Sequence, residues 1–443
     1  MRDWQDKSYW LGADPYQPNP ALKEDLEVDL CIIGGGFTGL SSAYYIKQKK
    51  PELEIALLEA EVVGYGASGR NGGFSMPLLG WNISYLVWAF GVERAKRAHH
   101  FMLSCVRRTK ELVERENIDC DLEYNGLLVL ARTPRQMRAL EADYKNYQKV
   151  EAEGVELLDQ NQLKDRLNSA WHIGAIYEPE CAILNPAKLA RGMKQVVERM
   201  GVKVFEHTPC RKFEPGKEII VHTSEAKIKC RYLVLATNAF TVQLRVNRNW
   251  YVPMFTYIIL TEPLNDQLYQ ELAWKKREGI EDKRQLVHYL RLTRDNRLLF
   301  GGRDAPYYFG NQLEQDRHEK IFARLKEDMS GMFPFLKDVK ITHRWGGPVA
   351  ITLFFVPRLG YFQEQRNIVY GMGYCGHGVA LSTSSGLIIH DLLFEEKSER
   401  TQLLFVNNPA GLIPPEPFRY ILVNLVKDSL RFYDYLSEQI IKG

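Results

Sequence analysis

The order of elements around one glycine-rich turn constrains the fold of this chain most strongly. The apolar run from Val28 to Ile33 predicts a buried strand, and the stretch GGGFTG follows it directly. A helix from about Thr38 must end before Pro51, because the residue preceding a proline avoids the α region. A second apolar run, from Ile55 to Leu58, predicts another strand. Strand, glycine turn, helix and strand together predict a βαβ unit.

The spacing of the glycines in this turn indicates a site for a dinucleotide. Gly34, Gly36 and Gly39 form G-x-G-x-x-G. The first glycine makes the turn, the second lets a pyrophosphate approach, and the third lets helix and strand pack closely. Glu59 ends the next strand, where a carboxylate can accept hydrogen bonds from both hydroxyls of an adenosine ribose. The alternative is a tight turn with a surface glutamate. A carboxylate here disfavours a 2′-phosphate, so NAD and FAD remain.

A second glycine-rich loop distinguishes these two cofactors. Residues 64 to 73, GYGASGRNGG, hold five glycines in ten positions. Glycine allows another surface to come into contact with the backbone. Such a loop directly after the ribose-binding strand is superfluous for NAD. It suits a dinucleotide whose diphosphate and ring are both covered by backbone, which favours FAD.

Composition excludes several other classes of protein. The chain has 443 residues, a net charge of +3 and no basic block interleaved with aromatics, so we expect no nucleic-acid partner. Seven scattered cysteines without a CxxC pair argue against a disulfide framework or a zinc site, and we expect no metal. The N-terminus lacks the order of a signal peptide, and no apolar run approaches the roughly 18 residues of a membrane span. We therefore expect a cytoplasmic protein without a membrane partner.

The remaining patterns predict two interleaved domains. VKVFEH and YLVLATNAF predict strands that return to the first sheet, residues 251–303 predict antiparallel strands, and residues 313–328 predict a helix. The predicted fold class is α/β + α+β, in which a Rossmann-like FAD-binding domain is interleaved with an antiparallel-sheet substrate domain. The expected boundaries are 1–80, 171–245 and 341–410 for the first domain, 81–170 and 246–340 for the second, and 411–443 for a C-terminal helical tail.

Three stretches carry a family resemblance. GGGFTGLSSAYYI, GYGASGRNGG and GYCGHGVALSTSSG together resemble the D-amino-acid-oxidase superfamily of FAD-dependent amine oxidoreductases, and most nearly the γ-glutamylputrescine oxidoreductase branch. Further matches are SYW near the N-terminus, YIILTEPL before RLLFGGR, and RWGG. The resemblance spans nearly the whole chain except roughly the last thirty residues.

The resemblance implies a set of FAD-binding residues and a cofactor held without a covalent bond. In such proteins the second glycine loop runs along the pyrophosphate and the flavin, and Asn238 stands where many relatives carry glycine. The first glycine loop here has no cysteine or histidine for covalent attachment. The implied contacts are Gly34, Gly36, Phe37, Thr38, Gly39, Glu59, Ala60, Gly66, Ala67, Ser68, Arg70, Asn71, Gly72, Gly73, Cys210, Ala236, Thr237, Asn238, Gly376, Gly378 and Val379.

The resemblance also implies the reaction. GYCGHGV, residues 373–379, would point a helix N-terminus at the N1/C2=O edge of the flavin, where His377 is either catalytic or structural. The expected activity is oxidation of a small amine or amino acid by hydride transfer to flavin N5, giving an imine that hydrolyses, with oxygen or another electron acceptor. The alternatives are a D-amino-acid or glycine oxidase or dehydrogenase, and a flavin-binding electron carrier without turnover.

Substrate contacts are expected on the antiparallel strands over the flavin. Arg303 is a candidate for holding a substrate carboxylate through bidentate pairing. The full set of candidates is Tyr257, His288, Tyr289, Arg303 and Trp345. The apolar positions of the C-terminal stretch FRYILVNLVKDSLRFYDYLSEQII recur at near-helical spacing, which predicts a helix docked on its own chain or on a second subunit.

Overall fold

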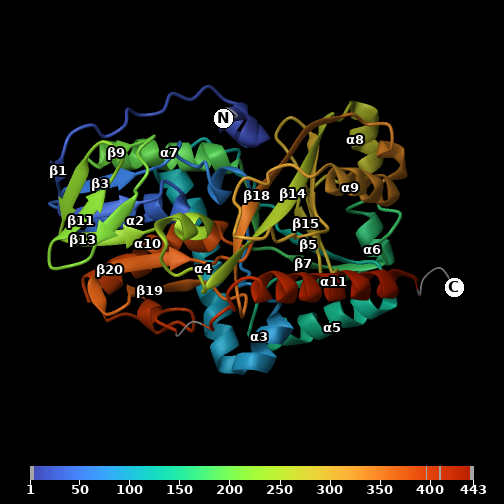
Figure 1. Cartoon of the computed structure of the whole chain (residues 1–443). Helices are drawn as coiled ribbons and strands as arrows, with labels where there is room; N and C mark the ends of the chain where they lie inside the picture. Colours follow the sequence, from blue (N-terminus) through green and yellow to red (C-terminus); the bar gives the residue numbers. More distant parts are fainter. Residues whose placement is uncertain (1–3, 396, 409–410, 440–443) are drawn as a thin grey trace.

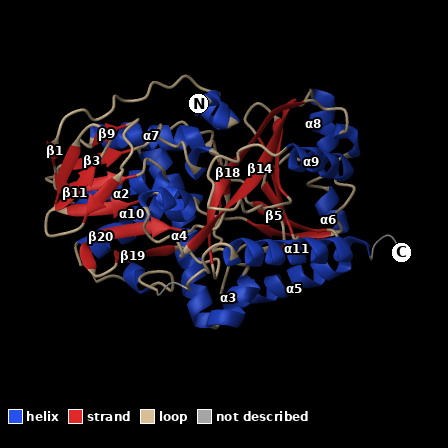
Figure 2. Ribbon diagram, viewed as in Figure 1, coloured by secondary structure: helices blue, strands red, loops and turns tan. Residues whose placement is uncertain are grey.

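A computed structural model describes residues 4–395, 397–408 and 411–439. Two large sheets lie side by side (Figures 1 and 2). The first has six strands in the order β19-β20-β13-β2-β3-β9, and every neighbouring pair except β19–β20 is parallel. Its strands are β2 (Leu30–Ile33), β3 (Ile55–Leu58), β9 (Lys203–Phe205), β13 (Tyr232–Leu235), β19 (Arg358–Phe362) and β20 (Gln365–Met372). The predicted Rossmann-like sheet, with β9 and β13 returning to it, is confirmed.

Helices pack against the parallel sheet and against one another. They are α2 (Phe37–Lys49), α4 (Val92–Arg115), α7 (Pro186–Arg199) and α10 (Val379–Leu393). At the contact between α2 and α10, a Cβ placed on Gly386 would lie 2.0 Å from the carbonyl oxygen of Ser41, so only glycine permits this approach. The Ser41 hydroxyl donates to the carbonyl of Ser382 at 2.7 Å, which satisfies a polar group inside the contact.

The second large sheet has eight strands in the order β18-β14-β17-β16-β15-β5-β7-β6. It is antiparallel except between β15 and β5. Its strands are β5 (Leu127–Ala131), β6 (Glu156–Asp159), β7 (Gly174–Glu178), β14 (Tyr251–Pro263), β15 (Gly279–Asp282), β16 (His288–Leu292), β17 (Arg297–Gly302) and β18 (Ile341–Thr352). The predicted antiparallel sheet is therefore present.

One side of this sheet packs against its own helices. Phe255, Tyr257 and Leu290 share a buried apolar cluster with Phe322 and Leu325 of α9 (Glu319–Met332). We call this the α9 side, and the opposite side the loop-facing side, because it lies against residues 64–73. Other helices around the sheet are α3 (Ile83–Phe90), α5 (Pro134–Lys149), α6 (Gln160–Lys164), α8 (Asp266–Leu272) and α11 (Phe418–Gln439).

Short elements complete the chain. A small sheet is formed by β1 (Leu26–Glu27), β10 (Lys212–Glu214), β11 (Ile219–His222) and β12 (Lys227–Cys230), and β4 (Phe74–Ser75) pairs with β8 (Ala182–Ile183). The N-terminal helix α1 spans Tyr9–Gly12, and 3-10 turns span Trp4–Lys7, Ala67–Gly69, Asn238–Leu244, Pro334–Leu336 and Glu399–Gln402. Among the described residues, no helix is both long and apolar enough to cross a membrane.

Local sequence signals explain where several helices begin. Thr133 caps α5 by accepting from the backbone of Gln136 at 3.1 Å, and the Gln136 side chain accepts from the backbone of Thr133 in return. Asn185 caps α7 by accepting from the backbone of Lys188 at 3.1 Å, with Pro186 in the first turn. The helix expected at 313–328 begins instead at Glu319, because the backbone of Ile321 donates to the ring of His318 and closes the first turn there.

The sheets divide the chain at places that differ from the expected domain boundaries. Strand β18, from the segment 341–410 assigned to the FAD-binding domain, pairs with β14 along most of its length in the eight-stranded sheet. Conversely, α4 from the segment 81–170 packs on α10, where the hydroxyls of Thr109 and Thr383 lie 2.7 Å apart. The domain division remains a proposal, and residues 440–443 of the expected tail lie outside the described residues.

Candidate functional site

The first glycine turn, residues 34–39, is held by contacts between backbone atoms. Gly34 has a φ of +113°, and a Cβ there would lie 2.6 Å from the carbonyl oxygen of Ala236 at the end of β13. A Cβ on Gly39 would lie 1.9 Å from the carbonyl oxygen of Gly34. Gly36 caps α2 without a side-chain hydrogen bond, which leaves backbone N–H groups at the helix N-terminus for an anion.

Glu59 is oriented by the backbone around it. Its two carboxylate oxygens accept from the backbone N–H of Gly35 at 2.8 Å and from that of Glu61 at 3.0 Å. Burial raises the pKa of Glu59 to about 7, against the two backbone hydrogen bonds that lower it. Each oxygen keeps a further acceptor site, so the carboxylate can receive two hydroxyls. Ala60 is exposed beside it, and Cys210, which follows β9 in the sequence, is half-buried.

Asn238 fits the tight turn that follows β13. Its φ of +41° lies in the left-handed region, which asparagine tolerates better than most residues. Its side-chain oxygen accepts from the backbone N–H of Gly373 at 2.9 Å. The side chains of Thr237 and Thr241 are 2.7 Å apart in the turn that follows. Asparagine is therefore compatible with this turn and ties it to the end of β20.

The second glycine loop, residues 64–73, is fixed from outside by four side-chain donors. Loop carbonyl groups that face protein need such partners because water does not reach them. The donors come from the N-terminal segment, from β16 and from β18. They are the Ser8 hydroxyl to Gly69 at 2.6 Å, the Trp10 indole to Asn71 at 2.9 Å, the Trp345 indole to Arg70 at 2.8 Å and the Arg291 guanidinium to Gly73 at 3.4 Å.

The inner surface of the loop offers polar groups to a ligand. Ser68 accepts from the backbone N–H of Phe37 at 3.0 Å, which joins the loop to the start of α2. Arg70 is only 4% exposed, and its Nε donates to the carbonyl of Tyr65 at 2.7 Å. One terminal nitrogen of Arg70 is buried and has no hydrogen-bond partner in the part of the chain that the structure describes. A buried, unsatisfied guanidinium N–H is costly, so this nitrogen fits an acceptor atom on a bound cofactor.

The third turn, residues 373–378, lies between β20 and α10. Gly376 has a φ of +90° with open space around its Cα, and Gly378 caps α10 without a side-chain hydrogen bond. The Cys375 thiol lies 3.1 Å from the carbonyl of Gly373, and burial raises its pKa to about 11. A neutral thiol held in this way is a poor nucleophile. Val379 is buried at the start of the helix.

His377 contacts the loop-facing side of the eight-stranded sheet. Its Nε2 lies 3.7 Å from Oε1 of Glu281 on β15, and both side chains are partly exposed. Its Nδ1 is buried and makes no hydrogen bond within the described residues. The histidine thus stands between α10 and the sheet with one ring nitrogen facing a carboxylate.

The five candidate substrate contacts divide between the two sides of the sheet. Tyr289 and Trp345 lie on the loop-facing side: Tyr289 packs against Phe74 and Gly72, and Trp345 donates to the loop. The other three lie with α9. Their partners are Tyr308 and Gln315 for Tyr257, Asp282 and Asp328 for His288, and Asp328 for Arg303.

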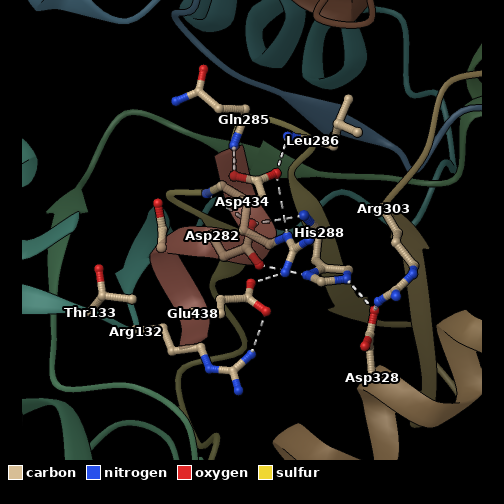
Figure 3. A network of polar contacts seen from close by, with 12 residues as sticks. Arg132, Thr133, Asp282, Gln285, Leu286, His288, Arg303, Asp328, Asp434 and Glu438 are labelled. Carbon is tan, nitrogen blue, oxygen red and sulfur yellow. Dashed lines mark hydrogen bonds and ion pairs between the residues drawn. The ribbon is translucent and has the colours of Figure 1, made fainter. Parts of the chain in front are cut away.

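Figure 3 shows why His288 and Arg303 are structural in this arrangement. His288 is fully buried, with its ring nitrogens 2.6 Å from Asp282 and 2.9 Å from Asp328. Arg303 pairs with the same Asp328 of α9. Alternation along the strand places His288 and Tyr289 on opposite sides of the sheet. The geometry therefore does not support the expected role of Arg303 in holding a substrate carboxylate.

Sequence reasoning missed two carboxylates on the loop-facing side. Glu281 neighbours Asp282 on β15 and points the other way, toward His377. Glu178 on β7 accepts from the hydroxyl of Tyr147. Burial raises the pKa of Glu178 to about 7, and the nearby charges of Asp143 and Glu281 add to the rise. Strand alternation could have assigned these side chains to one side, but only with the register of β15, β5 and β7 known.

Comparisons with known proteins agree with this geometry. The family model described as DAO, FAD dependent oxidoreductase, matches residues 29–392. The chain is 31% identical over 396 residues to the γ-glutamylputrescine oxidoreductase of Escherichia coli K12, covering 89% of this chain and 90% of that protein. It is 28% identical over 429 residues to a probable oxidoreductase OrdL of Haemophilus influenzae, covering 95% and 94%.

Solved structures show the same fold. The glycine oxidase of Geobacillus kaustophilus superposes with a TM-score of 0.73 at 19% identity, covering 87% of this chain and all of that one. The L-proline dehydrogenase of P. horikoshii superposes with a TM-score of 0.68 at 18% identity, covering 86% and 96%. At this level of identity the likeness supports the fold alone.

Replacing Glu59 by alanine should weaken the binding of FAD while leaving the chain folded. The variant loses two hydrogen bonds to a carboxylate, each worth about 1.5–3 kcal/mol before water replaces it. We expect the dissociation constant of FAD to rise about 10- to 100-fold, as measured by fluorescence titration of the apoprotein. The matched control is Glu61→Ala, which removes a neighbouring carboxylate and keeps the backbone N–H. An unchanged affinity in Glu59→Ala would exclude Glu59 as the ribose ligand.

The affinity for FAD should also depend on pH around neutrality. The pKa of Glu59 in the cofactor-free chain is raised to about 7, and only the carboxylate accepts two hydroxyls. Affinity is therefore expected to rise as pH increases to about 7, to level off above it, and to fall below it by up to about tenfold per pH unit. Titrations between pH 5.5 and 8.5 measure this, and Glu59→Gln should abolish the slope. A slope that persists in Glu59→Gln would assign the titration to another group.

Proposed function

Because the chain belongs to the DAO family of FAD-dependent oxidoreductases, we propose that it oxidises a small amine at the carbon that carries the nitrogen. The observation that carries this proposal is the pair formed by Glu281 and His377 on the loop-facing side of the sheet. The pair lies where the third turn approaches the sheet, and the third turn is one of the segments proposed to contact the flavin. FAD, when bound, supplies the acceptor for a hydride and its two electrons.

The residues present suit FAD as the group bound. Glu59 would receive the ribose hydroxyls, the first glycine turn and the N-terminus of α2 would hold the pyrophosphate, and the second glycine loop would cover the ring. Arg70 would give its unsatisfied N–H to the cofactor. We propose that the attachment is non-covalent, since the Cys375 thiol is already engaged with Gly373 and its pKa is raised. Flavin released by acid precipitation would agree with this.

The Glu281–His377 pair would prepare the amine for oxidation. An amine in water at pH 7 carries a proton on nitrogen, and its lone pair is needed as the C–H bond gives up hydride. A carboxylate at this place binds the ammonium group and then takes one proton from its nitrogen. The Nε2 atom of His377 lies 3.7 Å from Oε1 of Glu281, so the ring would orient this carboxylate toward the amine. Loss of hydride from the carbon of the neutral amine leaves a protonated imine, which water hydrolyses to a carbonyl compound and a protonated amine or ammonium.

The charges on this side of the sheet favour an amine over an amino acid. Glu281 is acidic and partly exposed, and a substrate carboxylate near it would be repelled. Arg291 lies on the same side but is fully buried and donates to the carbonyls of Leu184 and Leu292. The printed name of the relative at 31% identity, a γ-glutamylputrescine oxidoreductase, also supports an amine substrate. Glycine oxidation, the activity named for a sequence relative that is 23% identical over 87% of this chain, is the second candidate.

Anaerobic bleaching of the flavin tests the proposal. Holoenzyme is mixed with aliphatic mono- and diamines, acylated diamines, glycine, sarcosine, and D- and L-amino acids, and the absorbance of the oxidised flavin is followed. We expect bleaching by amines that lack an α-carboxylate. Bleaching by amino acids alone would contradict this choice, and no bleaching by any compound would favour an electron carrier. Admission of air afterwards distinguishes an oxidase from a dehydrogenase.

The variant Glu281→Gln should lose activity and keep its cofactor. The amide cannot take a proton, so we expect kcat/KM for the best amine at pH 7 to fall about 10²- to 10³-fold. The activity that remains should rise with pH as more free amine is present. Glu156→Gln, at an exposed position of β6 in the same sheet, is the control and should behave as wild type. Equal losses in both variants, or loss of FAD from Glu281→Gln, would exclude the proposed role.

A further inference from the structure

The C-terminal helix α11 is docked on the rest of the chain through its polar side. Arg419 is 2% exposed and donates to the side chains of Asn249 at 2.6 Å and Asn311 at 3.0 Å. Asp434, also 2% exposed, accepts from the backbone N–H groups of Gln285 at 2.9 Å and Leu286 at 3.0 Å (Figure 3). These contacts fix which side of the helix faces inward.

Further ion pairs along α11 reinforce this orientation. Arg431 lies 2.6 Å from Asp304, and Glu438 pairs with Arg284 and lies 3.3 Å from Arg132. In Figure 1 the helix runs beside α5 along the eight-stranded sheet. An amphipathic helix on a protein surface normally turns its apolar side toward the core. Here the arrangement is the opposite, so the apolar side of α11 faces solvent.

The exposed side of α11 has the spacing of a coiled-coil seam. Its positions repeat at intervals of four, three, four, three and four residues, which is the 3.5-residue period of the a and d positions of a heptad. Large apolar side chains occupy five of the six positions, and a serine occupies the sixth. They are Phe418 (66% exposed), Leu422 (43%), Leu425 (64%), Ser429, Phe432 (61%) and Leu436 (47%).

The seam also has the same spacing in both directions. Counted about residue 427, Phe418 corresponds to Leu436, Leu422 to Phe432, and Leu425 to Ser429. Two antiparallel copies would therefore place a phenylalanine opposite a leucine at both ends. In the middle, a leucine would lie opposite the small Ser429, where the helices come closest. Such self-complementarity is what a two-fold symmetric interface requires.

From this geometry we propose that α11 pairs in antiparallel orientation with α11 of a second copy of this chain, making the protein a symmetric dimer. The proposal concerns assembly and does not rest on the proposed reaction. The exposed parts of the seam and of its neighbours Ile421 and Val426 add to those of Tyr433 and Tyr435, which flank the seam. Since a whole aromatic side chain has about 150–250 Å² of surface, each copy offers an area on the order of 1,000 Å². A standard interface takes about 800 Å² from each partner.

The charges on α11 favour a second copy over a lipid surface. A helix that lies in a membrane interface keeps lysine and arginine on the side turned toward the headgroups and water. On the corresponding side of α11, Arg419 is buried against its own chain, and Arg431 is paired with Asp304 of its own chain. The charged side chain beside the middle of the seam is Asp428, which is 59% exposed. A carboxylate there is unfavourable in a lipid interface and tolerable at the rim of a protein interface.

The mass of the holoenzyme in solution is the first test. Light scattering with size-exclusion chromatography at micromolar concentration should give twice the mass of the chain. Leu425→Asp, which places a charge in the seam, should give the monomer, with the dissociation constant raised at least about 100-fold. Trp88→Asp is the matched control, because Trp88 is an apolar side chain of α3 that is 80% exposed and lies outside the seam. The flavin spectrum and melting temperature of the monomeric variant confirm that it is folded.

The orientation is tested by cross-linking. In the double variant Leu425→Cys, Ser429→Cys, oxidation should join position 425 of one copy to position 429 of the other, as identified by mass spectrometry of the peptides. A parallel pair would instead join each position to itself and would overturn the antiparallel arrangement.

Three other results would overturn the dimer altogether. One is a monomeric wild type, and another is a dimer that survives Leu425→Asp. The third is a monomer that co-sediments with phosphatidylcholine vesicles and loses this binding in Leu425→Asp, which would assign the seam to lipid.

Discussion

The close approach of backbone at Gly34 is the contact on which the cofactor site depends. β2, β13 and β20 are neighbours in the parallel sheet, and the turns that follow them meet at one edge. Gly34 has no Cβ and can touch the carbonyl of Ala236 in the turn that follows β13. Asn238 of that same turn accepts a hydrogen bond from Gly373 in the third turn. Ligands of open α/β sheets bind at the carboxyl ends of their strands. Three segments far apart in the sequence form one site because three strands end together.

The eight-stranded sheet depends on the same region through the second glycine loop. A loop with so many glycines gains little from its own side chains and loses much backbone entropy on ordering. Its order comes from partners: Ser8 and Trp10 hold it from the N-terminal segment, and Trp345 holds it from β18. The indole of Trp345 thus joins the eight-stranded sheet to this loop, and Ser68 joins the loop to the start of α2. The position of the loop-facing side relative to the first glycine turn follows from these two contacts.

Much of the fold could be predicted, because its signals are local, and the same local signals define the candidate cofactor site. The βαβ unit, the caps at Thr133 and Asn185 and the glycine turns are each determined within a few residues of sequence. The substrate side could not be predicted in this way. Tyr257, His288 and Arg303 face α9, whereas Glu281 faces the loop, and this depends on pairing between strands that are far apart in the chain. Similarly, periodicity predicted α11 correctly, but only its ion pairs determine which side faces inward.

Contacts between the β15–β16 hairpin and the C-terminal helix α11 help to fix the position of Glu281. Asp282, the next residue, accepts from the backbone and ring of His288 on the α9 side, and this fixes the short hairpin between β15 and β16. The loop of that hairpin gives its backbone N–H groups at residues 285 and 286 to Asp434 of α11. Because neighbouring strand residues face opposite ways, every contact that holds Asp282 in place also orients Glu281 toward His377. The tail, which lies outside the family match, therefore supports the side of the sheet where we place the substrate.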